Sequence, residues 1–409
     1  MINAGDTAWV LMSTGLVMLM TPGLAYFYGG MVRRKNVLGV LMQCFTILCV
    51  LSIQWVLYGY SLSFAPGGGF LGGLQWAGLN GVGAEPYKEY AATIPHSAFM
   101  VFQMMFAIIT PALIIGAFAE RMKFSAFLVF TVLWATFVYD PVAHWVWGIG
   151  GWLKDLGALD FAGGTVVHIN AGIAALATAL FIGKRKGYDH APVPPHNLPH
   201  TVLGTALLWF GWFGFNAGSA LAANGLAVNA FVVTNTAAAA AGLTWAAIEW
   251  ITNGKPTVFG VATGAVAGLV AITPAAGYVG PMSAIIIGIF VSIFCFVMVA
   301  IVKPRLGYDD SLDAYGVHGI GGIWGALATG LFATKMVNPD AADGLFFGNP
   351  KQFLIQVLAV VVTLAYSFLA TMIIYKVVDW VIGMRVAEKD ELIGLDLTQH
   401  HENAYTLLE

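Results

Sequence analysis

Charged residues are scarce in this chain: Asp, Glu, Lys and Arg make up 10% of its 409 residues, whereas hydrophobic residues make up 59%. A soluble domain of this length carries more charge, and the mean hydropathy of +0.79 is typical of a polytopic helical membrane protein. The net charge of −3 says little about partners, because orientation depends on where basic residues lie and not on their sum, and nothing in the composition suggests nucleic acid. Composition therefore predicts an integral membrane protein, in contact with membrane lipid and without a nucleic-acid partner.

Cysteine is also rare. Cys44, Cys49 and Cys295 lie in apolar segments without C-x-x-C spacing, so we interpret them as small packing residues. The H-E-x-x-H, P-loop and G-x-S-x-G patterns are absent, which removes the usual signatures of zinc proteases, ATPases and serine hydrolases. We expect no enzyme activity, no cofactor and no metal. The first six residues carry no positive charge, so we expect the first apolar run to be retained as a span rather than cleaved.

Long hydrophobic runs dominate the remaining sequence. A template of about 20 apolar residues per crossing predicts an all-α protein with eleven transmembrane helices. The segments are 8–32, 38–64, 97–119, 125–151, 162–183, 199–222, 227–252, 257–278, 282–302, 315–335 and 352–382. The polar end of the chain contains no further span. We therefore expect a membrane domain over 1–383 and a C-terminal tail over 384–409.

Basic residues lie mainly on one side of these predicted crossings. Only Lys88, Lys154, Lys335 and Lys351 follow even-numbered segments, whereas 14 follow odd-numbered ones. These 14 are Arg33, Arg34, Lys35, Arg121, Lys123, Lys184, Arg185, Lys186, Lys255, Lys303, Arg305, Lys376, Arg385 and Lys389. The positive-inside rule then predicts an external N-terminus and a cytoplasmic tail.

A histidine recurs in one apolar setting, V-H-x-x-x-G-I, at Val167–Ile173 and again at Val317–Ile323. His168 lies in the fifth predicted segment and His318 in the tenth, so their helices run in opposite directions. This arrangement predicts inverted five-helix repeats, about 8–183 and 199–335, followed by an eleventh helix at 352–382. Inverted repeats often bind substrate where they meet near the midplane. We therefore expect the two imidazoles to share one site.

Other interpretations of the histidines remain open. A packed histidine bonded to a helix carbonyl is the simplest, but an ionisable group in a bilayer is costly and more often marks a pathway or a ligand. A facing pair can share one proton, although charging both rings is opposed by repulsion and desolvation. Two intramembrane histidines can also ligate haem, which would make the chain a membrane oxidoreductase.

Several longer motifs accompany the histidines. They are Pro22-Gly23-Leu24-Ala25-Tyr26-Phe27-Tyr28-Gly29-Gly30, Gly116-Ala117-Phe118-Ala119-Glu120-Arg121, Asp160-Phe161-Ala162-Gly163-Gly164-Thr165-Val166-Val167-His168, Gly211-Trp212-Phe213-Gly214-Phe215-Asn216-Ala217-Gly218-Ser219 and Tyr315-Gly316-Val317-His318-Gly319. In these motifs and their order the chain resembles the Amt/Mep/Rh ammonium transporter family, particularly its prokaryotic Amt branch. The resemblance covers nearly the whole chain.

The resemblance implies a homotrimer in the prokaryotic cytoplasmic membrane, with a narrow hydrophobic pore in each subunit. Trp147, Phe106 and Ser219 match an outer site for ammonium, or for its analogue methylammonium, where aromatic faces attract the cation. Phe106 and Phe215 match gate rings below that site. Asp160 matches an acidic residue that caps a helix, for which we expect a structural and electrostatic role.

A pore of this kind has to reject potassium. Ammonium can lose a proton and cross an apolar lumen as ammonia, whereas potassium would have to enter without its hydration shell. His168 and His318 would hold the ammonia and provide a separate route for the proton, which makes uptake electrogenic. The alternatives are a passive ammonia gas channel and an ammonium receptor that signals without transport.

The tail resembles the family signature G-L-D-x-x-x-H-G-E-N-A-Y. Its matching residues are Gly394, Asp396, Glu402, Asn403 and Tyr405, and His401 stands where the family usually has glycine. The signature implies cooperation between subunits and docking of a PII-type regulatory protein. A solvated tail without a partner is the alternative. We also expect Asp309, Asp310 and Asp313 to anchor the tail or to cap the tenth helix.

Overall fold

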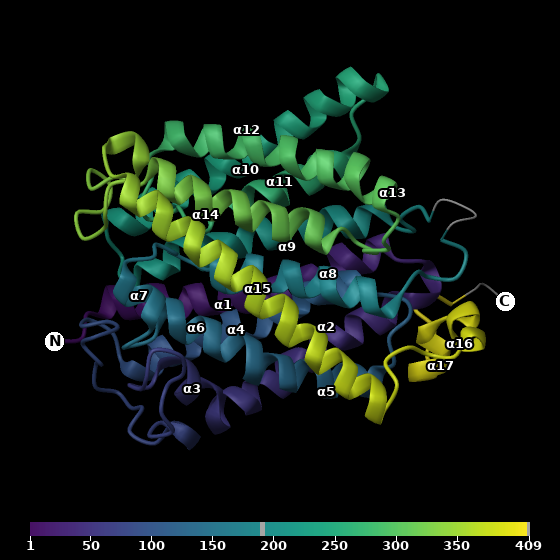
Figure 1. The fold of residues 1–409 in the computed structure, drawn as a ribbon, viewed down its shortest axis with the longest axis horizontal. Coiled ribbons are helices and arrows are strands. Elements are labelled where there is room, and N and C mark those ends of the chain that lie inside the picture. The colour runs from purple at the N-terminus through teal and green to yellow at the C-terminus, as the bar shows by residue number, and fades with distance from the viewer. Residues whose placement is uncertain (189–192, 407–409) are drawn as a thin grey trace.

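The computed structural model describes residues 1–188 and 193–406. Within these residues all regular elements are helices, and β-pairing is limited to two isolated bridges. Most of the long helices run lengthwise through the molecule, with the N-terminus at one end and the C-terminal tail at the other (Figure 1). The expected all-helical architecture is confirmed.

The helical runs follow the expected segments in order. They are α1 (Ala4–Met31); α2 (Val37–Gln54), η2 (Trp55–Gly59) and α3 (Tyr60–Phe64); α4 (His96–Phe118); α5 (Phe124–Trp134), η4 (Ala135–Tyr139) and α6 (Asp140–Trp147); η5 (Gly164–Ile169) and α8 (Asn170–Ile182); α9 (Leu198–Ala217); α10 (Gly225–Asn253); α11 (Val258–Ile272); α12 (Pro281–Val297), η7 (Met298–Val302) and α13 (Lys303–Leu306); η8 (Tyr315–Gly319) and α14 (Ile320–Phe332); and α15 (Pro350–Val381). Eight runs in the described chain are long and apolar enough to cross a membrane, and α11 is a shorter apolar helix.

Short elements occupy the connections. They are η1 (Arg34–Asn36), η3 (Ala77–Leu79), α7 (Trp152–Leu156), η6 (Gly218–Ala220) and η9 (Leu345–Phe347). Polar residues determine where several long helices begin. The side chains of Asn3, Asn197, Asn224 and Thr257 each accept a hydrogen bond from an amide in the first turn of α1, α9, α10 and α11. Such caps satisfy amides that have no partner within the helix.

Five turns in the described helices are π-helical, and two of them carry the histidines of the repeated motif. His168 lies in η5, immediately before α8, and His318 lies in η8, immediately before α14. A π-turn interrupts the regular hydrogen-bond ladder and often marks a functional site. The packing is reciprocal, since α8 contacts η8 and α14 contacts η5. The two halves of the chain therefore bring the histidine-bearing turns together.

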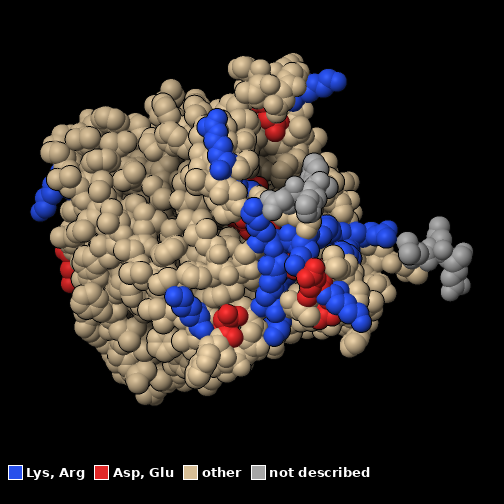
Figure 2. Space-filling view, turned by 45° about the vertical axis from the view of Figure 1, so that its right-hand side comes forward, with Lys and Arg blue, Asp and Glu red and all other residues tan. Residues whose placement is uncertain are grey.

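The tail is folded, in contrast to the solvated tail that the sequence left as an alternative. It forms α16 (Glu388–Ile393) and α17 (Leu395–His400), and α17 packs against α2 and η1. Both helices lie at the end of the molecule opposite the N-terminus (Figure 1). Lys and Arg side chains gather at this end (Figure 2). The final residues, 407–409, and part of the 184–197 connection lie outside the described residues.

Candidate functional site

His168 and His318 meet in the interior. Their ring centroids are 5.4 Å apart and the ring planes differ by 21°. His168 is 1% exposed and His318 is 3% exposed. Neither ring nitrogen of His168 has a hydrogen-bond partner, so the direct sharing of a proton that the sequence suggested is not present as a hydrogen bond. The imidazoles are adjacent, and the nitrogens of His168 remain available to a guest molecule.

Glycines allow this close approach. A Cβ on Gly172 would lie 2.2 Å from the amide nitrogen of Gly319, next to His318 in the chain. A Cβ on Gly322 would lie 2.9 Å from the amide nitrogen of Ile169 and 3.0 Å from the Cβ of His168. Each histidine is followed four residues later by one of these glycines. Each glycine packs against the other helix, next to that helix's histidine. The repeated V-H-x-x-x-G-I pattern therefore corresponds to one crossed helix contact.

A small cavity, which we call the lumen, lies beside the two rings and has a volume of about 10 Å³. This is close to the minimum space that holds one water-sized molecule, and it is far too small for a porphyrin. Most of the lining is apolar. The lumen is lined by Met20, Leu24, Phe27, Ile109, Leu113, Val167, His168, Leu208, Trp212, Phe215, Val266 and His318.

Two phenylalanine rings close one end of the lumen. The centroids of Phe106 and Phe215 are 4.2 Å apart, and each side chain is 1% exposed. Phe215 lies 6.1 Å from His168, and Phe102 contacts Phe106 at 5.0 Å. The rings thus form a continuous series that leads to the histidines. The structure brings the expected gate residues together, with Phe102 as a third ring.

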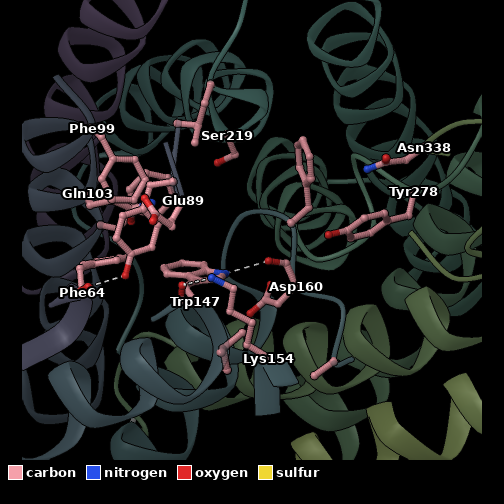
Figure 3. Close-up of a pocket in the computed structure, with 16 residues that line it drawn as sticks. Phe64, Glu89, Phe99, Gln103, Trp147, Lys154, Asp160, Ser219, Tyr278 and Asn338 are labelled. Atoms are coloured by element: carbon pink, nitrogen blue, oxygen red, sulfur yellow. Dashed lines mark hydrogen bonds between the residues drawn. The ribbon is translucent and has the colours of Figure 1, made fainter. Parts of the chain in front are cut away.

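Beyond Phe106 the protein opens into a vestibule of about 330 Å³ (Figure 3). The ring of Trp147 stands at 90° to Phe106, with centroids 5.9 Å apart. Ser219 donates its hydroxyl hydrogen to the carbonyl oxygen of Phe215 at 2.8 Å, so its oxygen is left to accept a hydrogen bond. Two aromatic faces and one acceptor oxygen therefore line the same space. A small cation that donates hydrogen bonds fits this chemistry.

Asp160 holds the backbone beside the vestibule. Its Oδ1 accepts hydrogen bonds from the amides of Gly163 and Gly164 at 2.8 and 2.6 Å. Its Oδ2 accepts from Thr165 and Val166 at 2.8 and 3.1 Å. The carboxylate thus satisfies four amides at the start of the η5–α8 run. All of these bonds lie within the chain, which is the geometry that a capping residue requires.

A matching aspartate precedes the second histidine. Asp310 lies eight residues before His318, as Asp160 lies eight residues before His168. Its two carboxylate oxygens accept from the amides of Ala314 and Tyr315 at 3.1 and 2.8 Å. Of the two roles that the sequence suggested for Asp309, Asp310 and Asp313, capping is therefore present at Asp310. The polar contacts of the three aspartates in the described chain go to residues outside the tail.

The other two aspartates of this loop form ion pairs. Asp309 pairs with Arg185 at 2.9 Å, and Asp313 pairs with Lys303 at 2.6 Å. Glu120 lies between the guanidinium groups of Arg185 at 3.2 Å and Arg33 at 2.7 Å. Burial alone would raise the pKa of Glu120, but these two guanidinium groups lower it below its ordinary value of 4.5. A largely buried ionic cluster therefore joins connections from both halves of the chain.

Some residues near the site were missed by sequence reasoning. Glu89, Gln103, Lys154 and Tyr278 line the vestibule (Figure 3). Gln103 could have been found, because it is a polar residue in an apolar helix, three positions before Phe106. Glu89 and Lys154 come from connections whose placement no helical period predicts.

The tail residues lie against the first connection and the 184–197 connection. The amide of Leu395 donates to Oδ1 of Asn36 at 2.8 Å, and the amide of Gly39 donates to Oδ1 of Asp396 at 2.8 Å. Tyr405 shares a hydrogen bond of 2.9 Å with Nε2 of His196. Asp396 therefore caps α2 from a position 357 residues away.

The other signature residues shape the tail itself. Gly394 has a φ of 121°, packs against Lys35 and separates α16 from α17. The amide of Glu402 donates to the carbonyl oxygen of Asp396 at 3.1 Å, and Asn403 lines a cleft beside Lys35. His401 follows α17 with a φ of 57°, in the left-handed region. Glycine adopts this conformation without strain, which explains why a glycine suits this position.

Taken together, the apolar helices, the closed lumen and the cation-compatible vestibule define an integral membrane transport protein for a small solute. The sequence matches the Ammonium Transporter Family over residues 8–405. It is 57% identical over 404 residues to an ammonium transporter of Bacillus subtilis (strain 168), and the match covers 99% of each chain.

Solved structures agree. Candida albicans Mep2 matches with a TM-score of 0.91 and 39% identity, covering 99% of this chain and 94% of that one. A structure described as a sensor Amt protein matches with a TM-score of 0.88 and 30% identity, covering 97% and 98%. The chain belongs to the ammonium transporter family, and its function is ammonium transport. Its relatives are transporters and not enzymes.

Proposed function

We propose that the vestibule binds ammonium between Trp147, Phe106 and Ser219, and that the ion loses a proton before it enters the lumen. Ammonia then passes the rings of Phe106 and Phe215 and reaches His168 and His318. The proton takes a separate route along the imidazoles, so net uptake is electrogenic. Asp160 supports the site by holding the backbone and contributing negative potential, without binding the ion.

One observation supports this proposal most strongly. Both nitrogens of His168 lack a protein partner while the ring lies in an otherwise apolar lumen with room for one small molecule. A buried polar group without a partner is costly, so a guest that can both donate and accept hydrogen bonds stabilises it. Ammonia does both. Potassium cannot lose its charge, and an apolar lumen offers too few ligands to replace its hydration shell.

We further propose eleven crossings with an external N-terminus and a cytoplasmic tail, in the cytoplasmic membrane of a prokaryote. The two inverted repeats would span about 8–183 and 199–335, within a transport domain over 1–383. The gathering of Lys and Arg at the tail end supports this orientation (Figure 2). The crossed contact between η5–α8 and η8–α14 supports the inverted repeat.

The assembly that we propose is a homotrimer whose tail, over 384–409, receives a PII-type regulatory protein on the cytoplasmic face. The signature residues Gly394, Asp396, Glu402, Asn403 and Tyr405 support this proposal, because they lie in a folded, docked segment instead of a free extension. A docked tail presents a defined surface, which a partner can recognise at a lower entropic cost.

A transient current measured on an ammonium jump, with the protein reconstituted in liposomes on a solid-supported membrane, tests the mechanism. We expect a current in the wild type that the double variant His168→Ala/His318→Ala abolishes or converts to a potassium leak. A wild type without current but with an ammonia-dependent pH change in the vesicles would instead indicate a passive ammonia channel.

A receptor is the second candidate, because a structure described as a sensor Amt protein is similar over nearly the whole chain. A receptor would bind ammonium in the vestibule without moving it through the lumen. The two assays separate this function from transport, since a receptor that does not conduct gives neither a current nor a pH change.

A further inference from the structure

A lysine enters the vestibule that we propose as the ammonium site. Lys154 extends from α7 toward Trp147 (Figure 3). Its Nζ donates to the carbonyl oxygen of Trp147 at 3.0 Å and lies 5.3 Å from the ring centroid of Tyr90. A carbonyl oxygen and an aromatic face are the groups that stabilise a free ammonium ion. Lys154 therefore places a tethered primary ammonium group at the rim of the proposed site.

The backbone of Lys154 is held in place on both sides. The amide of Trp152 donates to the carbonyl oxygen of Gly69 at 3.1 Å, and Leu153 is 0% exposed. The helix ends at Gly157, whose φ of 94° turns the chain away. The main chain is fixed, so the position of the charge is set by the flexible side chain alone. The Nζ can exchange between the vestibule and solvent without any backbone movement.

The charge of Lys154 is not neutralised by contact. Among the described residues, no carboxylate oxygen lies within 4.0 Å of its Nζ, and Glu89 lines the vestibule without an ion pair. The carboxylate of Asp160 is committed to four backbone amides. Asp155 acts on this charge only at a distance, so a second cation that enters the vestibule meets a positive charge without a contacting counter-ion.

We propose that Lys154 is a tethered competitor that sets the affinity of the vestibule for ammonium. Its Nζ occupies a carbonyl oxygen and an aromatic face at the rim of the site, and its charge lowers the local concentration of cations. The inference rests on the proposed function of Trp147, Phe106 and Ser219 as the recruitment site. It assigns Lys154 to substrate affinity and leaves the lumen and the histidines unaffected.

Methylammonium uptake tests this inference in intact cells that lack other ammonium transporters, because such cells expose only the outer mouth. Initial rates give KM and the maximal rate for the wild type, Lys154→Met and Lys154→Arg. Methionine keeps the aliphatic length and removes the charge, and arginine keeps the charge. Lys351→Met is the matched control, because Lys351 is an exposed lysine at the start of α15 that does not line the vestibule.

We expect Lys154→Met to lower KM by about threefold to tenfold at low ionic strength, with a smaller effect in 0.5 M sodium chloride, where charges are screened. Lys154→Arg and Lys351→Met should keep the wild-type KM, and all variants should keep the maximal rate. An unchanged or raised KM in Lys154→Met would overturn the inference. So would an equal decrease in Lys351→Met.

Trp147→Leu in the same assay separates this inference from the proposed function. If Trp147→Leu raises KM while Lys154→Met leaves it unchanged, the recruitment site stands and the role of Lys154 is wrong. If Trp147→Leu leaves KM unchanged, the recruitment site is wrong, and the inference about Lys154 falls with it.

Discussion

The crossed glycine contact predicts that a single methyl group will disrupt transport. Gly172→Ala places a Cβ 2.2 Å from the amide nitrogen of Gly319, whereas ordinary contacts begin near 3.4 Å. The neighbouring atoms belong to backbone, so they cannot rotate away as a flexible side chain would. The helices that carry His168 and His318 therefore have to separate by roughly 1 Å at this point, by the ordinary contact limits of packed interiors.

The energetic cost follows from two opposing effects. Overpacking a well-packed core lowers the free energy of unfolding by about 1–3 kcal/mol, and the better helix propensity of alanine raises it by about 1 kcal/mol. The expected net loss is therefore at most about 2 kcal/mol, which lowers the melting temperature by a few degrees and leaves a folded protein. Function should suffer more, because displacing reacting groups by 1 Å can cost up to about 100-fold in rate.

The measurements are the thermal unfolding of the purified protein in detergent and the ammonium-jump current in proteoliposomes. Gly15→Ala is the matched control, because a Cβ on Gly15, within α1, has no atom within 4 Å. We expect the control to keep its current and to melt at or slightly above the wild-type temperature. A Gly172→Ala protein with wild-type current would refute the argument that the spacing of the two histidines governs conduction.

Three further predictions concern the cytoplasmic end as we propose it. His401→Gly relieves the strain of a non-glycine residue in the left-handed backbone region. It should stabilise the docked tail by about 1 kcal/mol, seen as slower hydrogen exchange in α17. Asp396→Ala removes the cap on α2 and should cost about 1 kcal/mol, seen as faster exchange of the amides in its first turn. Glu120→Gln removes one of the two carboxylates beside Arg185, which keeps Asp309, and should cost about 1.5–3 kcal/mol at neutral pH, seen as a lower melting temperature.

Glu120 also predicts a pH dependence. Its folded-state pKa lies below 4.5, so its ionic contacts stabilise the fold above that value and lose this effect as the pH falls through the folded-state pKa. The melting temperature of the wild type should therefore fall more than that of Glu120→Gln as the pH is lowered from 6 to 3.

Each of these predictions has an outcome that would contradict it. Parallel pH profiles would exclude Glu120 as a source of the acid sensitivity. For the tail, His400→Gly is the control for His401→Gly, because it weakens the helical end of α17 instead of relieving strain. Faster exchange in both variants would show that the conformation of His401 is not strained. Unchanged exchange at the start of α2 in Asp396→Ala would show that the cap contributes nothing.

The membrane explains why much of the architecture could be predicted from the sequence. Apolar runs of about 20 residues have few alternatives to helices, because lipid leaves no other partner for backbone groups. The histidines were also predictable, since ionisable residues are rare in such runs and a matched pair in opposed repeats points to one site. The glycine four residues after each histidine was visible in the same pattern.

The remainder depends on contacts between connections, where no periodicity applies. Lys154 reaches the vestibule from a short helix, and the sequence identified it only as a basic residue on the outer side. The tail docks on Asn36 and His196, which lie 359 and 209 residues before Leu395 and Tyr405. Nothing in the local composition of the tail predicts such partners, so the sequence suggested a regulatory tail without indicating where it docks.

The tail contact makes α2 a sensor of the state of the tail. While the tail is docked, Asp396 accepts a hydrogen bond from the amide of Gly39 in α2, and Asn36 accepts one from the amide of Leu395 in the tail; detachment leaves these groups to water. Any ligand that prefers the detached tail has to supply this free energy, and any change that weakens the start of α2 lowers that cost by the same amount. Since α2 packs against α4, the helix that carries Phe106, an event at the tail end of the molecule has a continuous physical route to the rings that close the lumen.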